Sequence, residues 1–207
     1  MLKLGILVSG GGTNLQAIID KIQNGYLSNC EIVTVVSSRA GVYALERARK
    51  HGIPAACISS KSFSALKDYD QALLEHFRQH DVELVVLAGF LSMLGEAFVS
   101  AYKNRIINIH PSLIPAFCGK GYYGIVPHRK AIEYGVKVTG ATVHFVDLEY
   151  DSGPIILQKA VEVQDDDTPE SLQLRVMQEA EWELLPKAIK LFSESSLVLE
   201  GRKVRII

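Results

Sequence analysis

The chain has 207 residues, a length that suits one domain of generous size with a sizeable core. Hydrophobic residues make up 48% and charged residues 22%, which is the balance of an ordinary globular protein and not of a disordered chain. The formal net charge is −1, so the overall charge gives no sign of a nucleic-acid or membrane partner.

The cysteines indicate a reducing compartment. Cys30, Cys57 and Cys118 are odd in number and far apart, which argues against a disulfide framework or a zinc site. The apolar run at the start of the chain meets glycines at once and is far too short for a signal sequence or a membrane span. We therefore expect a cytoplasmic protein whose first residues form a strand.

Strands alternate with helices in the first half of the chain. Short apolar runs predict strands over residues 4–8, 31–37, 55–58 and 83–88. Helical periodicity predicts helices over residues 15–22, 42–51 and 69–80. This order predicts a parallel, doubly wound, Rossmann-like sheet with right-handed crossovers.

The second half changes character. A short strand over 106–109 runs into a proline-braced turn and a glycine-rich loop. Further elements are expected in the order helix 127–134, strands 140–146 and 154–163, helix 169–192 with Thr168 as N-cap, and hairpin 197–207. The fold class is therefore α/β, with a mostly parallel sheet and antiparallel additions in the C-terminal half.

A glycine-rich turn, Ser9-Gly10-Gly11-Gly12-Thr13-Asn14, follows the first predicted strand and opens the first predicted helix. Glycines allow the backbone to turn sharply and to approach a ligand closely. Free N–H groups at a helix N-terminus suit a phosphate, and the side chains of Thr13 and Asn14 add donors. The turn therefore predicts a phosphate site. The structural alternative is a tight turn in which Thr13 is the N-cap.

The kind of phosphate ligand stays open at this point. No lysine follows the last glycine, so the turn is not a Walker A motif, and the third glycine of the dinucleotide fingerprint is missing. The second strand ends without an acid that could hold a ribose, which weakens NAD. Arg39 leaves an NADP-dependent oxidoreductase possible, and a phosphate on a small substrate fits equally well. A non-catalytic nucleotide-binding module is the third alternative.

Asn108 and His110 form a candidate polar pair. They alternate along a predicted strand, so both side chains point to the same face. They stand at the carboxyl end of that strand, just before Pro111, where ligands of such sheets commonly bind. A lone histidine is usually structural, but the pair at this position predicts a site. Asp151, in a turn, and His144, on an apolar strand, are by themselves more typical of structural residues.

Four stretches together resemble a known family. They are Ser-Gly-Gly-Gly-Thr-Asn-Leu-Gln at 9–16, Asn-Ile-His-Pro-Ser-Leu-Ile-Pro-Ala-Phe at 108–117, Gly-Ala-Thr-Val-His-Phe-Val at 140–146 and Asp-Ser-Gly-Pro-Ile-Ile-Leu-Gln at 151–158. They are similar to the motifs of the folate-dependent formyltransferases, and within these to the phosphoribosylglycinamide formyltransferases of purine synthesis. The resemblance runs in order over nearly the whole chain.

Two other branches of the superfamily fit less well. Methionyl-tRNA formyltransferases carry a further C-terminal domain, for which we expect no room. Formyltetrahydrofolate deformylases have an extra N-terminal regulatory domain, whereas the catalytic fold here is expected to start at Leu4. Neither branch has a phosphate-binding turn like this one.

The resemblance implies formyl transfer from 10-formyltetrahydrofolate, as co-substrate, to the amine of glycinamide ribotide, without a metal. It implies one domain over 1–207, with a phosphate-binding half at 1–105 and a catalytic and folate-binding half at 106–207. Small molecules are the expected partners, with no nucleic acid or membrane, and the protein is expected to be a monomer or homodimer.

The resemblance also implies roles for single residues. The catalytic residues are Asn108, His110 and Asp151. The phosphate and ribose contacts are Gly12, Thr13, Asn14 and Glu181. The folate contacts are Lys67, Leu91, Ser92, Met93, Leu94, Asn108, Val146 and Asp147, with Thr142 and His144 in support.

The chain departs from the family pattern in three places. Ser92 stands where the family often has an arginine. Leu66, with Lys67 beside it, stands where the family has a basic residue. These differences leave open how the pterin and the glutamate tail are held. The loop 118–127 is longer and richer in glycine than in many relatives.

The implied mechanism makes a prediction about charge. Attack of the amine on the formyl carbon creates a tetrahedral oxyanion, to which Asn108 and a protonated His110 can donate. A free histidine has a pKa of about 6.5, and a neighbouring carboxylate favours the charged form. We therefore expect Asp151 to raise the pKa of His110.

Overall fold

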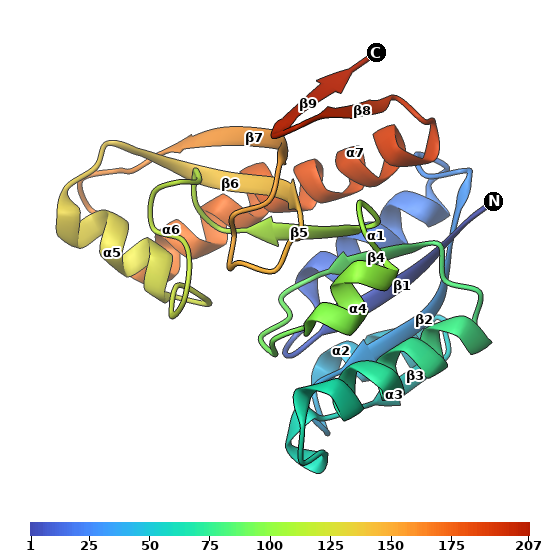
Figure 1. Ribbon diagram of the computed structural model, residues 1–207. Helices are drawn as coiled ribbons and strands as arrows, with labels where there is room; N and C mark the ends of the chain where they lie inside the picture. The colour runs from blue at the N-terminus through green and yellow to red at the C-terminus, as the bar shows by residue number, and fades with distance from the viewer. The chain divides into compact units, whose positions relative to one another are not determined.

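The computed structural model describes all 207 residues, which form two compact units, Met1–Ile107 and Asn108–Ile207 (Figure 1). The boundary falls inside strand β5 (Ile106–His110). None of the helices combines the length and the apolar character that crossing a lipid bilayer demands.

The first unit is an α/β unit. Its elements are β1 (Leu2–Val8), α1 (Thr13–Gln23), β2 (Cys30–Ser37), α2 (Tyr43–Lys50), β3 (Ala55–Cys57), η1 (Ser60–Ser62), α3 (Leu66–Gln79), β4 (Leu84–Leu87) and α4 (Glu96–Ala101). The strand order is β3-β2-β1-β4, followed by the start of β5. The pairs β1–β2, β1–β4 and β2–β3 are parallel, which confirms the predicted sheet.

Burial explains why the strands and helices of the first unit were predictable from the sequence. All four residues of β4 are buried, and so are the last five of β1, as expected of parallel strands covered by helices on both faces. Helix α1 buries Leu15, Ile18 and Ile19, whose spacing places them on one helical face.

The second unit begins with the end of β5. Its other elements are α5 (Val126–Tyr134), β6 (Val138–Phe145), β7 (Ile155–Glu162), α6 (Pro169–Val176), η2 (Met177–Glu181), α7 (Trp182–Ser193), β8 (Leu197–Glu200) and β9 (Lys203–Ile206). The long strands β6 and β7 lie side by side and are antiparallel, as are β8 and β9, whereas β7 and β9 pair in parallel (Figure 1). The predicted antiparallel additions are confirmed.

The structure differs from the predictions in the long C-terminal helix and in helix α4. The helix expected over 169–192 is interrupted by the π-helical turn η2, which apolar periodicity cannot distinguish from an α-helical turn. The helix α4 was not predicted, because six residues carry too little periodicity.

The predicted N-cap of α6 is confirmed. Thr168 Oγ1 accepts from the Ser171 N–H at 3.2 Å, and Ser171 Oγ accepts from the Thr168 N–H at 3.0 Å.

Candidate active site

Strand β5 delivers Asn108 and His110 to one carboxylate. Ile107 and Ile109, which alternate with them, are buried in the core, while Asn108 is half-buried and His110 is 4% exposed. The Asn108 amide lies 3.4 Å from Asp151 Oδ1, and His110 Nδ1 lies 3.5 Å from Asp151 Oδ2. The two side chains therefore share a face of the strand, as predicted.

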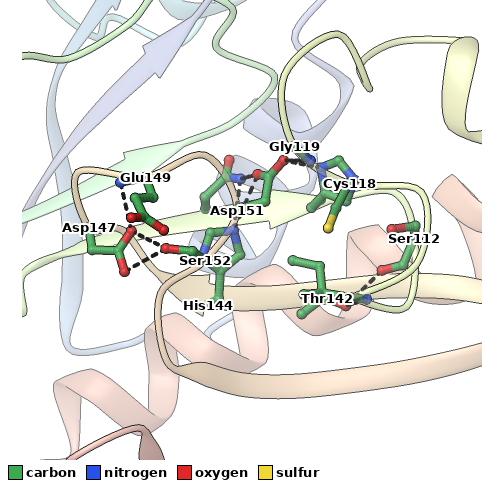
Figure 2. Close-up of polar contacts among 12 residues, drawn as sticks. Ser112, Cys118, Gly119, Thr142, His144, Asp147, Glu149, Asp151 and Ser152 are labelled. Atoms are coloured by element: carbon green, nitrogen blue, oxygen red, sulfur yellow. Dashed lines mark hydrogen bonds and ion pairs between the residues drawn. The ribbon is translucent and has the colours of Figure 1, made fainter.

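The Asp151 carboxylate is the centre of the cluster. Its Oδ2 accepts a hydrogen bond from the backbone N–H of Gly119 at 2.8 Å, and its Oδ1 lies 3.6 Å from His144 Nε2 (Figure 2). Burial raises the pKa of the Asp151 carboxyl, but the charge of His110 and the hydrogen bond from the Gly119 N–H act in the opposite direction, and the net pKa is lowered. The carboxylate is thus held in its charged form inside the protein.

A compact turn fixes Asp151 in place. Asp151 has a φ of 52°, in the left-handed region that aspartate tolerates better than most side chains. The Asp147 carboxylate accepts the Ser152 hydroxyl at 2.7 and 2.8 Å, as Figure 2 shows. A Cβ on Gly153 would lie 1.8 Å from the Phe145 carbonyl oxygen, so only glycine allows the chain to pass here.

His110 is held from both sides. Its Nε2 lies 3.0 Å from the carbonyl oxygen of Phe117, which can only accept, so Nε2 carries a proton. Its Nδ1 faces Asp151. Burial lowers the pKa of His110, while Asp151 and the Phe117 carbonyl raise it, and the net pKa is below the ordinary value. Asp151 acts in the predicted direction, but the cost of burying the charged ring is larger.

His144 orients the Asn108 amide. His144 is 1% exposed, and its Nδ1 donates to the Phe145 carbonyl oxygen at 2.7 Å. Its Nε2 is then available to accept from Asn108 Nδ2 at 3.2 Å. The Asn108 amide nitrogen therefore faces two acceptors, His144 and Asp151, and the bond to Asp151 is the longer one.

Thr142 braces the turn that follows His110. Its hydroxyl donates to the Ser112 carbonyl at 2.7 Å and accepts from the Ile114 N–H at 3.1 Å. The Gln158 amide adds a third bond to the same hydroxyl at 3.0 Å. The Ser112 hydroxyl in turn donates to the Ala116 carbonyl at 2.6 Å. Thr142 thus shapes the loop that brings the Phe117 carbonyl to His110.

His128 was not identified from the sequence. It lies on α5, is 1% exposed, and neither ring nitrogen has a hydrogen-bond partner in the protein. Burial, with the charge of His110 as a smaller cause, lowers the pKa of His128 to about 4. Its position after Pro127 gave only a helix-start signal, so nothing in the sequence marked it as buried.

The glycine-rich turn belongs to the first unit. Gly12 is the N-cap of α1, with a φ of 73°, and no side chain caps the helix. Thr13 is the first helical residue, so the prediction that it is the N-cap in a tight turn is wrong as regards the cap. A Cβ on Gly12 would lie 2.7 Å from the Ala44 Cβ. Asn14, at 7% exposed, is largely buried.

The segment 91–94 is anchored at both ends within the first unit. The Leu91 N–H donates to Ser9 Oγ at 2.9 Å, and Ser9 directly precedes the glycines of the turn. The Gly95 N–H donates to Asp70 Oδ1 at 2.8 Å, and the Asp70 side chain is buried. The backbone of the segment is therefore fixed between two anchored positions.

The other residues that were predicted to contact the folate or the ribose differ in exposure to solvent. The exposed ones are Lys67, Leu91 and Met93. The half-buried ones are Ser92, Val146 and Asp147. The buried ones are Leu94 and Glu181, the latter at 7% exposed on the π-helical turn η2.

Comparison with known proteins identifies relatives along the whole chain. Residues 2–189 match the formyl transferase family. The crystal structure of glycinamide ribonucleotide transformylase 1 from Symbiobacterium toebii is 45% identical and covers 100% of this chain and 94% of its own, with a TM-score of 0.94. Phosphoribosylglycinamide formyltransferase of Haemophilus influenzae is 38% identical over 97% of this chain and 91% of its own length.

A longer relative matches as well. Trifunctional purine biosynthetic protein adenosine-3 of Chironomus tentans is 41% identical over 97% of this chain. The chain spans only 14% of the length of that relative. It therefore corresponds to one part of the larger protein.

Proposed function

The chain belongs to the formyl transferase family, and we propose that it transfers the formyl group of 10-formyltetrahydrofolate to the amine of 5'-phosphoribosylglycinamide. The products are formylglycinamide ribotide and tetrahydrofolate, in de novo IMP biosynthesis. Similarity to phosphoribosylglycinamide formyltransferases over nearly the whole chain supports this activity. The observation that carries the site is the Asp151 carboxylate, 13% exposed, which both Asn108 and His110 contact.

In this proposal the two polar side chains of β5 stabilise the oxyanion. The substrate amine attacks the formyl carbon, and negative charge develops on the formyl oxygen. The Asn108 amide can exchange its longer hydrogen bond, to Asp151, for one to the formyl oxygen. A protonated His110 adds a charged donor to the same oxygen. Each such donor contributes on the order of 3–4 kcal/mol to lowering the barrier.

His110 is also the proposed general acid. Its Nδ1 faces Asp151, so the proton on Nε2, here bonded to the Phe117 carbonyl, is the one available to the departing folate nitrogen. Asp151, through a water molecule, is the proposed acceptor of the excess proton from the attacking amine. Asp151 thereby has two roles, because its charge also favours the protonated form of His110.

The substrate contacts are proposals of the same kind. We assign the ribotide phosphate to Gly12, Thr13 and Asn14, because they form the N-terminus of α1. Glu181 is assigned to the ribose hydroxyls. We assign the folate to Asn108 and to Lys67, Leu91, Ser92, Met93, Leu94, Val146 and Asp147. The two units are proposed to act as one formyltransferase domain.

Location and assembly stay predictions. We expect a cytoplasmic protein that acts on small molecules, as a monomer or a homodimer, without nucleic acid or membrane. The NADP-dependent oxidoreductase and the nucleotide-binding module lose their support, because the match to formyl transferases covers residues 2–189.

One assay tests the activity. The protein is mixed with 10-formyltetrahydrofolate and glycinamide ribotide, and the absorbance change of the folate is followed. We expect turnover that depends on both substrates. Nicotinamide binding without folate turnover would instead support the oxidoreductase.

A further inference from the structure

The glycine-rich turn is attached to helix α2 through its carbonyl groups. The Gly10 carbonyl accepts from the Ala44 N–H at 3.2 Å. The Gly11 carbonyl accepts from Arg47 Nε at 2.9 Å. The contact that a Cβ on Gly12 would make with Ala44 shows how closely the turn is seated on α2.

These two bonds determine where the N–H groups of the turn point. In a planar trans peptide the carbonyl and the N–H point in opposite directions. The carbonyls of Gly10 and Gly11 point toward α2, so the N–H groups of Gly11 and Gly12 point away from it. They also lie at the start of α1, where the helix dipole favours an anion.

Arg47 is itself held in a fixed geometry. Its Nη1 donates to Gln16 Oε1 at 3.0 Å, and its guanidinium carbon lies 4.7 Å from the centre of the Tyr43 ring. Gln16 is oriented by a further bond to Asp20 at 2.8 Å. The acceptors of Arg47 are a carbonyl and an amide oxygen, both neutral, so these bonds leave its positive charge unneutralised beside the turn.

We propose that Arg47 is a positioning residue for the phosphate of the ribotide: it orients the N–H groups of the glycine-rich turn and adds positive charge behind them. This inference rests on the proposed phosphate site in the turn. Ala44 orients the first peptide through its backbone, whereas the second depends on a side chain. Replacing Arg47 should therefore weaken binding of the substrate phosphate and leave the rate of formyl transfer unchanged.

The test compares two arginines and two substrates. Arg47→Met removes the anchor, while Arg49→Met removes an equal charge from an exposed position on the same helix. Each variant is assayed with glycinamide ribotide and with its dephosphorylated nucleoside. For Arg47→Met we expect kcat/KM with the ribotide to fall roughly 10- to 100-fold, mainly through KM. With the nucleoside, and for Arg49→Met with either substrate, we expect changes of less than about threefold.

A conservative variant guards against loss of folding. Arg47→Lys keeps the charge, but an ammonium group lacks the planar fork with which arginine reaches both Gly11 and Gln16. We therefore expect a partial loss of kcat/KM with the ribotide and no loss with the nucleoside. Thermal unfolding of each variant shows whether the fold is retained. If neither Arg47→Met nor Arg47→Lys discriminated between the two substrates, the role of Arg47 would be refuted.

Gly12→Ala separates this inference from the phosphate site on which it rests. If Gly12→Ala lost activity selectively with the ribotide and the Arg47 variants did not, the phosphate site would stand and the role of Arg47 would fall. If none of these variants distinguished the ribotide from the nucleoside, the phosphate would bind elsewhere, and both assignments would be wrong.

Discussion

The glycine-rich turn and the Asp151 cluster, for which we propose phosphate binding and proton transfer, differ in the polar groups that they contain. The turn offers backbone N–H groups, which cannot titrate and whose direction is set by bonds to α2. The cluster uses side chains that can gain or lose protons, packed where burial opposes charge. The proposed phosphate site thus lies in one local segment, whereas the proposed site of proton transfer combines groups from several segments.

The largest effect is expected in the cluster. His110→Ala removes both a donor to the oxyanion and the proposed general acid, so kcat should fall by roughly 10³-fold or more. The KM for the ribotide should change little, because its phosphate is assigned to the turn. Steady-state kinetics with both substrates measure the two effects, and a rate near that of the parent protein would remove His110 from the mechanism.

Removing the carboxylate should change the pH dependence as well as the rate. Asp151→Asn should lower kcat roughly 10²-fold, with Asp166→Asn, at an exposed aspartate, as a control. In the parent protein, activity should rise as the pH rises through the pKa of Asp151 and fall as it rises through that of His110. In the variant the first limb should disappear and the second should begin at lower pH. An unaltered profile would contradict both roles of Asp151.

A substitution in the glycine-rich turn should mainly weaken the affinity for the ribotide. Gly12→Ala places a Cβ 2.7 Å from the Ala44 Cβ at a φ of 73°, so we expect a roughly tenfold higher KM for the ribotide and about 1–3 kcal/mol lower stability. Gly25→Ala is the matched control, because its φ is 81° but the space around it is open. That control should lower stability by about 1 kcal/mol and leave KM unchanged. Equal effects of the two substitutions on KM would argue against the phosphate site.

The smallest effect concerns stability. The pKa of His128 is lowered to about 4 in the folded chain, so as the pH falls below about 6.5 only the unfolded chain takes up this proton. From pH 7 to pH 5 this should reduce the free energy of unfolding by about 2 kcal/mol. His128→Gln should remove that part of the pH dependence in urea unfolding. If the parent and the variant lost equal stability, the ring would not be buried in its neutral form.

The same contrast explains how much the sequence could predict. The turn lies within six consecutive residues, and Asn108 and His110 lie two apart on one strand, so local patterns reveal both. Asp151 joins them from a turn after β6, and residues far apart in sequence meet only once the chain has folded. Residue chemistry alone gave Asp151 the role of a solvated turn residue. Its place in the site came from the family motif.

Burial was the other quantity that the sequence could not supply. His128 follows a helix-starting proline and carries no apolar pattern that marks it as internal, yet it is 1% exposed. The net pKa of His110 likewise depends on how far the ring is desolvated, which local sequence does not give. The direction of the effect of Asp151 was predictable, but its size relative to burial was not.

The proposed chemistry depends on the charge of Asp151, which favours the protonated form of His110 against the cost of burial. Titration of the His110 ring by nuclear magnetic resonance, in the parent protein and in Asp151→Asn, measures this directly. In the parent we expect a pKa below the ordinary value for histidine, and in the variant a pKa that is lower still. An unchanged or higher pKa in the variant would contradict the claim.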